Sequence, residues 1–352
     1  MKHKLGIIGF GGMANWHFEN CPKTGCIEPV AVYDIDPDRV KAGEKKGVAG
    51  FYSLEEFLDS RLFDVVLVAT PNNFHHDLSV AALRAGYHVI CEKPVTMTVA
   101  ELQDVFRVAE ECGKLFTVHQ NRRWDADFNI VRKAIETGMV GKPYTIESCV
   151  HGSGGVVHGW REVKAGGGGM LYDWGIHLID QILYMMGEEK VTDVFCHFNS
   201  VRTPEVDDYF KLILTFADGL NVQIEVGTYC LKAKPRWYVN GSEGSLILED
   251  WDCHGSVTHS SQTAMKWEPV VVQTKAGPTR TMAPRPKETL EELPLPALDP
   301  GCEWENFYRN ICGVIDGTAE LIVRHDQMLR VMQVVEAGFR SAEARHSIPV
   351  EI

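Results

Sequence analysis

The chain lacks any long hydrophobic run. No apolar stretch approaches the roughly 18 residues that a membrane-spanning helix needs. The first residues, MKHKLGIIGFGG, join basic side chains to a short apolar run, but that run stops at glycines and no small-residue cleavage site follows. We therefore expect neither a membrane span nor a secretion signal, and we expect a cytoplasmic protein.

Cysteine pairs and an excess of positive charge are also missing. The cysteines show no C-x-x-C spacing and stand at positions 21, 26, 91, 112, 149, 196, 230, 253, 302 and 312. This scatter is typical of reduced thiols and not of a disulfide framework or a zinc site. Lysine and arginine number 35 against 48 acidic residues, a net charge of −13, which argues against nucleic acid or an anionic membrane as the main partner.

What is present is enough sequence for two domains, because 352 residues exceed one ordinary core. From Lys4 to about Val118, short apolar runs alternate with amphipathic stretches, which predicts βαβ units and a parallel sheet. The expected strands are Leu5–Ile8, Val30–Tyr33, Val65–Ala69, His88–Cys91 and Leu115–Val118. The expected helices are Ala14–Asn20, Pro37–Lys46, Ser53–Asp59, Phe74–Ala85 and Val99–Cys112.

The pattern changes after Trp124, where one amphipathic helix to about Glu136 leads into longer alternating runs. The expected strands here are Val191–Val201, Tyr209–Phe216, Asn221–Cys230 and one within Gly241–Glu249, and helices near Glu303–Asp316 and His325–Arg345 close the chain. The six prolines of Pro278–Pro300 predict an irregular or extended excursion over the surface. The predicted fold is an α/β Rossmann domain with a doubly wound parallel sheet (residues 1–122), then an α+β domain with a mostly antiparallel open sheet (residues 123–352).

A glycine loop follows the first strand. Residues Gly9 to Ala14 give G-x-G-x-x-A, in which alanine takes the third glycine position of a dinucleotide fingerprint. Gly9 permits the tight turn and Gly11 lets the backbone approach a pyrophosphate, while Gly12 and Met13 open a helix whose N-terminus favours an anion. Glycines at such a turn also occur for packing alone, so the loop by itself is a weak signal.

Asp34 ends the second strand, where an acidic side chain accepts hydrogen bonds from the adenosine ribose. A carboxylate repels a 2′-phosphate and Ile35 adds no compensating charge, so the sequence favours NAD over NADP. The alternative is that Asp34 only starts the turn before Pro37 and caps the next helix, a role that Asp36 could fill just as well.

Two further elements carry chemistry. Glu92-Lys93-Pro94 follows the strand His88–Cys91 at the carboxyl edge of the sheet, where open α/β sheets bind ligands and where a lysine can donate to a substrate oxygen. Beyond a run of four glycines, Asp173 and His177 are four residues apart, so a helix would place them on one face with the carboxylate orienting the imidazole for acid/base work. A helix cap at Asp173 and a core histidine are the alternative.

Taken together, these segments resemble the glucose–fructose oxidoreductase/inositol dehydrogenase family, often called Gfo/Idh/MocA. The similarity runs over nearly the whole chain. Besides the glycine loop, Asp34 and the Asp173/His177 element, it includes Ala69-Thr70-Pro71-Asn72 with His75, Gly86 through Pro94, and His119-Gln120-Asn121-Arg122-Arg123-Trp124. The resemblance implies a Rossmann domain followed by an α+β domain whose open sheet builds a homodimer or homotetramer.

The resemblance also implies roles for individual residues. Lys93 matches a lysine that touches both the nicotinamide ribose and the reacting oxygen, His177 the proton carrier, and Asp173 a carboxylate that binds substrate hydroxyls. The cofactor contacts would be Gly9, Gly11, Gly12, Met13, Asp34, Thr70, Pro71, Asn72, His75, Glu92 and Lys93. Arg122, Trp160 and Arg161 also look like substrate contacts of scyllo-inositol-type dehydrogenases.

The implied activity is reversible hydride transfer between NAD and a secondary hydroxyl of a small-molecule sugar, glycoside or cyclitol. Two other functions stay open, namely an NAD-retaining glycosidase that works by transient oxidation and a non-enzymatic dinucleotide sensor. The histidines His75, His76, His151 and His158 raise the possibility of a metal, but their spacing and the missing carboxylate argue against one, and we expect none.

Overall fold

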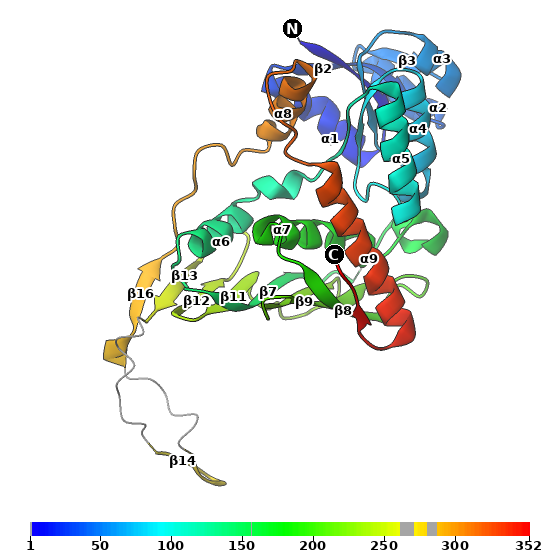
Figure 1. Ribbon diagram of the computed structural model, residues 1–352. Coiled ribbons are helices and arrows are strands. Elements are labelled where there is room, and N and C mark those ends of the chain that lie inside the picture. Colours follow the sequence, from blue (N-terminus) through cyan, green and yellow to red (C-terminus); the bar gives the residue numbers. More distant parts are fainter. Residues whose placement is uncertain (1, 156, 261–270, 280–286) are drawn as a thin grey trace.

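The computed structural model describes residues 2–155, 157–260, 271–279 and 287–352 (Figure 1). Two large sheets organise these residues, one in each half of the expected fold, and a small two-stranded sheet accompanies them. Every helix among them is too short or too polar to cross a membrane. The ten cysteines, all of which lie in this part of the chain, form no disulfide.

The first half is a Rossmann domain. Its six parallel strands have the order β3-β2-β1-β4-β5-β6, the doubly wound arrangement expected from the sequence. The strands are β1 (His3–Ile8), β2 (Ile27–Tyr33), β3 (Ala49–Phe51), β4 (Val65–Val68), β5 (His88–Cys91) and β6 (Phe116–Val118). The helices are α1 (Gly12–Asn20), α2 (Pro37–Lys45), α3 (Leu54–Asp59), α4 (His75–Arg84) and α5 (Val99–Cys112). All four residues of β4 are fully buried, as a strand covered on both faces requires.

The second half holds a nine-stranded sheet of order β16-β13-β12-β11-β7-β10-β9-β8-β17, in which only the pair β7 and β10 is parallel. Its strands are β7 (Pro143–His151), β8 (Val191–Asn199), β9 (Tyr209–Phe216), β10 (Asn221–Gly227), β11 (Trp237–Gly241), β12 (Gly244–Leu248), β13 (Gly255–His259), β16 (Glu291–Pro294) and β17 (Ile348–Pro349). Helices α6 (Ala126–Glu136), α7 (Ile176–Met186) and α9 (His325–Ala344) lie over one face (Figure 1). Along β9 every second residue is buried, so one face of this sheet meets the helices and the other stays open.

Several short elements differ from the sequence prediction. The strands β3, β11 and β13 were not expected, because three to five residues are too few to show an alternating pattern. Within Pro278–Pro300, which was predicted as irregular or extended, β16 is extended and pairs with β13 at the edge of the large sheet, a pairing that the prolines did not indicate. Strand β15 (Gly277–Thr279) also enters this segment and pairs with β14 (Val272–Thr274), while residues 280–286 lie outside the described residues.

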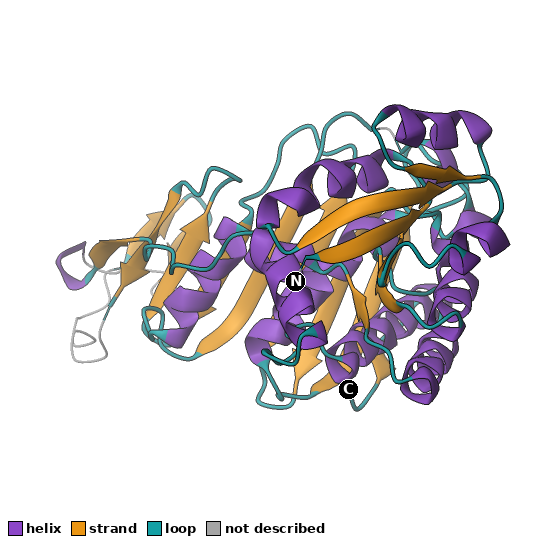
Figure 2. Cartoon of the chain, turned by 90° about the horizontal axis from the view of Figure 1, so that it is seen from above, coloured by secondary structure: helices purple, strands orange, loops and turns teal. Residues whose placement is uncertain are grey.

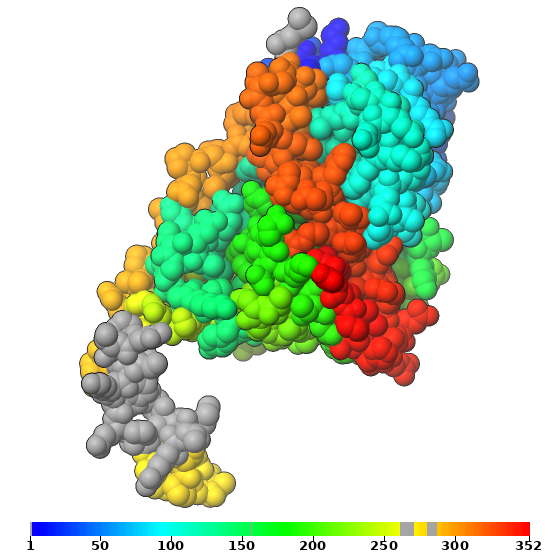
Figure 3. Space-filling model, in the orientation of Figure 1, coloured from blue at the N-terminus to red at the C-terminus, as the bar shows by residue number. Residues whose placement is uncertain are grey.

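Near its end the chain returns to the Rossmann domain. Helix α8 (Glu305–Ile315) packs against α1 and the short helix Cys21–Thr24, and its Tyr308 is fully buried there. One turn later, the Cys312 thiol contacts the carbonyl of Cys26 at 3.6 Å. In Figures 1 and 3 this late segment, drawn in orange, lies against the blue N-terminal part. The view from above in Figure 2 shows the helices and strands of the two sheets side by side.

Candidate active site

A cavity of about 890 Å³ brings the two halves of the chain together. Most of its lining comes from the carboxyl edge of the parallel sheet, where open α/β folds bind their ligands. The remainder comes from residues 160–177 of the second half. The lining includes every site residue predicted from the sequence except His75.

The glycine loop forms one wall of this cavity. Gly9 has φ +84°, and a Cβ there would lie 2.5 Å from the carbonyl oxygen of Ala69, so the turn requires glycine. At Gly11 and Gly12 a Cβ would meet little or nothing, which leaves bare backbone beside the start of α1. Free N–H groups at a helix N-terminus suit a pyrophosphate, so the residues present fit a dinucleotide.

Asp34 is buried at the end of β2 and serves the loop as well as the cavity. Its Oδ2 accepts the backbone N–H of Phe10 at 2.6 Å and its Oδ1 accepts that of Asp36 at 2.9 Å. Asp36, not Asp34, caps α2 by accepting the N–H of Asp38. Asp34 thus stabilises the turn and Asp36 caps the helix. Asp34 also lines the cavity, at the end of β2 where a ribose would bind.

Arg39 is a cavity residue that the sequence analysis missed. Its Nη1 lies 3.5 Å from Asp34 Oδ2 and is the nearest atom to a Cβ built on Gly11. The side chain is half exposed and lines the cavity. Arg39 lies in the first turn of α2, so only the helix start at Pro37 could have indicated its position.

The loop after β4 connects the two halves. Thr70, Pro71 and Asn72 line the cavity, and Asn72 donates its amide to the carbonyl of Gly167 at 2.8 Å. His75 is fully buried beneath this loop, where its ring nitrogens contact the carbonyls of Pro94 and Thr70 at 2.7 and 3.0 Å. The expected cofactor contact of His75 is therefore corrected: the imidazole holds two cavity loops together and does not reach the cavity.

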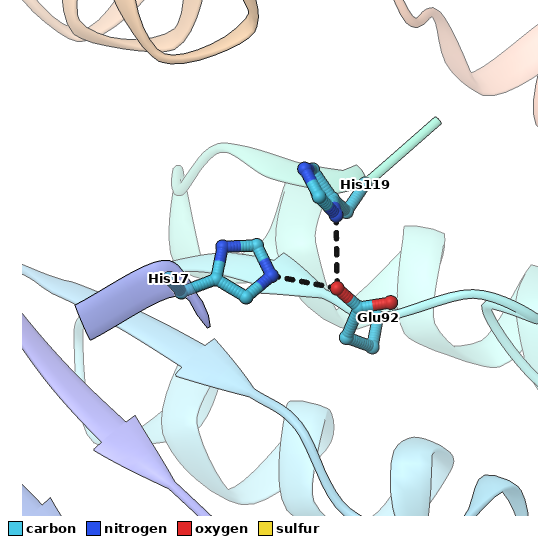
Figure 4. Close-up of side chains that lie close together, drawn as sticks. All are labelled: His17, Glu92 and His119. Atoms are coloured by element: carbon cyan, nitrogen blue, oxygen red, sulfur yellow. Dashed lines mark hydrogen bonds and ion pairs between the residues drawn. The ribbon is translucent and has the colours of Figure 1, made fainter. Parts of the chain in front are cut away.

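Glu92 lies at the bottom of a buried polar cluster (Figure 4). Its Oε1 accepts His17 Nε2 at 2.6 Å and His119 Nδ1 at 2.8 Å, and its Oε2 accepts the backbone N–H of Lys93 at 3.1 Å. Burial alone would raise the pKa of Glu92, but the two imidazoles outweigh burial and the pKa lies well below the usual range. The hydroxyl of Tyr308 in α8 forms a hydrogen bond with His17 Nδ1.

Lys93 and Asp173 form an ion pair across the two halves. Lys93 Nζ donates to Asp173 Oδ1 and to the Asp173 carbonyl, both at 2.7 Å. Arg161 Nε lies 3.4 Å from the same carboxylate. Burial opposes the charge of Asp173, yet Lys93 and Arg161 outweigh it and lower its pKa. The pairing joins two residues that lie eighty positions apart in the sequence.

His177 lines the same end of the cavity but is not paired with Asp173, so the predicted carboxylate–imidazole pair was wrong. Its Nδ1 is buried and has no hydrogen-bond partner among the described residues. Burial, helped by the charges of Lys93 and Arg122, lowers the pKa of His177 well below 6.5 and keeps the ring neutral. The cause is a π-helical turn at Leu171–Gly175, which rotates Asp173 away from the face that an α-helix would give it.

Aromatic rings and arginines surround this end of the cavity. Arg122 lies 4.1 Å above the ring of Trp174, a residue that the sequence analysis did not select, and Arg161 lies 4.5 Å from that of Trp160. Arg122 also donates to Asp125 at 2.9 Å. Flat rings suit the apolar face of a sugar or cyclitol, and guanidinium groups suit its oxygens.

The four glycines before Asp173 allow the close contacts that bring it to the cavity. A Cβ at Gly167 would meet Met97 and one at Gly168 would lie 2.2 Å from the carbonyl of Arg161. At Gly169, with φ +104°, it would lie 2.1 Å from Asp207. A larger side chain at Gly167 would push this segment away from the Rossmann domain, and one at Gly168 or Gly169 would collide within the second half.

The histidines considered for a metal do not meet. His76 pairs with Asp77 and Asp104, His151 faces Glu225 at 3.3 Å, and His158 is exposed. The sequence analysis missed a closer set, His17, Glu92 and His119, because its members come from three separate elements. Their N–O distances of 2.6 and 2.8 Å are hydrogen-bond lengths, shorter than the roughly 3.3 Å between two ligands of one tetrahedral zinc.

Comparisons with known proteins agree with this geometry. Residues 3–120 match the family model "Oxidoreductase family, NAD-binding Rossmann fold", and residues 128–247 match "GFO/IDH/MocA C-terminal domain". The structure superposes on an NAD-binding protein from Listeria innocua with a TM-score of 0.94, 40% sequence identity and 99% of both chains covered.

Two curated relatives are inositol dehydrogenases. The scyllo-inositol 2-dehydrogenase (NADP(+)) of Bacillus subtilis is 29% identical over 99% of this chain and 96% of its own. The myo-inositol 2-dehydrogenase of Thermotoga maritima is 34% identical over 61% of this chain and 66% of its own.

Proposed function

The chain belongs to the GFO/IDH/MocA family of NAD-binding oxidoreductases, and from this premise we propose that it oxidises a secondary hydroxyl of a sugar, glycoside or inositol-like cyclitol. One observation carries the proposal. Lys93, Asp173 and His177 meet at one end of a cavity whose other end is formed by the glycine loop and Asp34. The names of the inositol dehydrogenase relatives support a polyol substrate.

Bound NAD supplies the hydride acceptor. The ammonium of Lys93 donates a hydrogen bond to the reacting oxygen and lowers the cost of its developing negative charge. The neutral imidazole of His177 takes the hydroxyl proton, and the unpartnered Nδ1 leaves it without a competing internal hydrogen bond at that atom. Proximity and this proton transfer supply the catalysis.

Asp173 holds Lys93 in place and accepts hydrogen bonds from neighbouring hydroxyls of the substrate. Trp160 and Trp174 offer flat surfaces to the ring, while Arg122 and Arg161 donate to its oxygens. The net charge of −13 disfavours binding to nucleic acid and agrees with a small-molecule substrate.

A panel of inositols, aldoses and pyranosides, each incubated with NAD, tests the proposal. NADH accumulating with at least one polyol supports it. Glycoside cleavage without net NADH would instead identify the NAD-retaining glycosidase, and NAD binding with neither reaction over the whole panel would favour the sensor.

A further inference from the structure

The buried carboxylate of Glu92 lies where it can act on the cofactor as well as on the protein. It lines the cavity and is adjacent in sequence to Lys93, and its electrostatic influence reaches His177. If Lys93 and His177 meet the substrate, as the proposed function requires, the nicotinamide lies at this end of the cavity. The ring carries a positive charge in NAD⁺ and none in NADH.

The hydrogen bonds around Glu92 require a negative charge. The rings of His17 and His119 both point at Oε1 (Figure 4). The backbone N–H of Lys93 is a third donor, to Oε2. A carboxylate that accepts several N–H groups is held in its charged form. A protonated Glu92 would turn one acceptor into a donor and leave an imidazole N–H unpaired in a dry site.

The direction of these bonds follows from His17. Burial, assisted by His119, lowers the pKa of His17 to about 4, so the ring is neutral and has one donor and one acceptor. Nε2–H donates to Glu92, and Nδ1 therefore accepts the Tyr308 hydroxyl. The chain of bonds runs from α8 through α1 to the end of β5 and delivers donors, not positive charge, to the carboxylate.

A charge count shows what Glu92 contributes. Three cations line this end of the cavity, Lys93, Arg122 and Arg161, and Asp173 and Asp125 pair with them. Glu92 supplies the third negative charge, so the set is neutral with it and carries +1 without it. Within the described chain the side-chain partners of Glu92 are the imidazoles of His17 and His119, and no lysine or arginine pairs with it.

We propose that the negative charge of Glu92, held in place by His17 and His119, favours bound NAD⁺ over bound NADH and so shifts the cofactor equilibrium on the enzyme toward the oxidised form. Only the charged ring gains from the carboxylate, and a group that binds two states unequally shifts their equilibrium by that difference. Glu92 thereby favours release of NADH after oxidation of the substrate. The proposal rests on the proposed function only for the position of the nicotinamide.

Direct binding measurements on the substrate-free protein test this. The dissociation constants of NAD⁺ and NADH are measured by calorimetry for the wild type, for E92Q, for E92D, and for E110Q, which removes one exposed charge on α5. We expect E92Q to weaken NAD⁺ about tenfold relative to NADH, the order that one unit charge gives at a protein-like dielectric constant. E92D and E110Q should leave the NAD⁺/NADH ratio within about twofold of the wild type.

Equal changes in both constants for E92Q, an unchanged ratio, or the same shift in E92D would overturn the proposal. These readouts need no substrate, so they stand even if no polyol in the panel is oxidised.

If E92Q does not fold, H119F takes its place, since Phe307 and Trp16 already pack around that ring. H119F removes one hydrogen-bond donor from the Glu92 carboxylate, so Glu92 is protonated more readily. The preference of the variant for NAD⁺ should therefore decline as the pH is lowered from 8 to 5, whereas the preference of the wild type stays constant. Among the described residues, the other titratable groups that interact electrostatically with Glu92 include His17, Tyr308, His75, Cys91 and His177. A flat H119F profile would count against the role of the charge.

Discussion

At the scale of single residues, Lys93 is the group that joins the sheet edge to the second half of the molecule. We expect K93M to fold and to bind NAD but to lose turnover by about 10² or more, because the reacting oxygen loses its positively charged donor. Turnover and NAD affinity are measured together, with K190M as a control at an exposed lysine that pairs with Glu351. Near-normal turnover in K93M would remove the lysine from the mechanism.

We expect Asp34 and Arg39 to set the cofactor preference together. The wild type should prefer NAD, because a 2′-phosphate would meet the Asp34 carboxylate. D34S should bring NADP binding at least tenfold closer to NAD binding, since Arg39, 3.5 Å away, is then free to pair with the phosphate. Adding R39A to D34S should reverse most of that gain in titrations with both cofactors. Equal or tighter NADP binding by the wild type would contradict the assignment.

The lowered pKa of His177 predicts how oxidation depends on pH. Because its pKa lies well below 6.5, the imidazole is a ready proton acceptor at neutral pH, and kcat should rise with pH only on the acidic side and then level off. H177A should depress oxidation by about 10² to 10⁴ and flatten this rise while NAD affinity stays nearly unchanged. The lowered pKa of His177 also decreases folding stability as the pH falls below 6.5, because the unfolded chain binds a proton at this imidazole more tightly than the folded chain does. A rise centred above pH 7 would show that another group carries the proton.

At the scale of elements, the segment that carries Asp173 begins against Asp207. Asp207 Oδ2 accepts the N–H of Leu171 at 2.8 Å, and burial raises the pKa of this carboxyl from 3.8 to about 7. The folded state therefore holds the proton more tightly than the unfolded state. The stabilisation that protonated Asp207 gives the folded state is complete below about pH 4 and is lost as the pH rises to about 7.

Replacing Asp207 with asparagine should remove this dependence, because the amide oxygen still accepts the N–H of Leu171 without a charge to bury. Relative to the wild type, D207N should gain stability between pH 5 and pH 8, by at most about 4 kcal/mol for a shift of this size. Urea unfolding at both pH values measures the difference. A constant difference between variant and wild type would show that Asp207 does not titrate in this range.

The elements also show what the sequence could and could not predict. Long strands such as β9 and the helices α5 and α9 carry clear periodicity and were predicted, as were the glycine loop and Lys93 at a strand end. The π-helical turn was not, because no residue pattern distinguishes it from an α-helix. The cluster of His17 with Glu92 was missed for another reason: its members are 75 residues apart and meet only through the tertiary fold.

At the scale of the whole molecule, the large sheet has an open face that no described helix covers (Figure 1). Ile213 of β9 and Phe195 of β8 pair across this face, opposite the buried Leu212 and Leu214. We expect a homodimer or homotetramer that forms through this face, and I213K should dissociate it by placing a charge in the interface. Light scattering over a range of concentrations measures the assembly, and a wild type that is monomeric throughout would contradict the prediction.

Because α8 packs against the N-terminal half, the chain cannot be divided into two independent domains at one point in the sequence. A fragment of residues 1–122 would lack Phe307, Tyr308 and Cys312, and it would expose the otherwise buried His17 and Cys21 to water. The nucleotide-binding half is thus not an exchangeable cassette encoded by one stretch of gene. A chimera that borrows the cofactor preference of a relative needs two inserts, the N-terminal segment and the α8 segment, transferred as a matched pair.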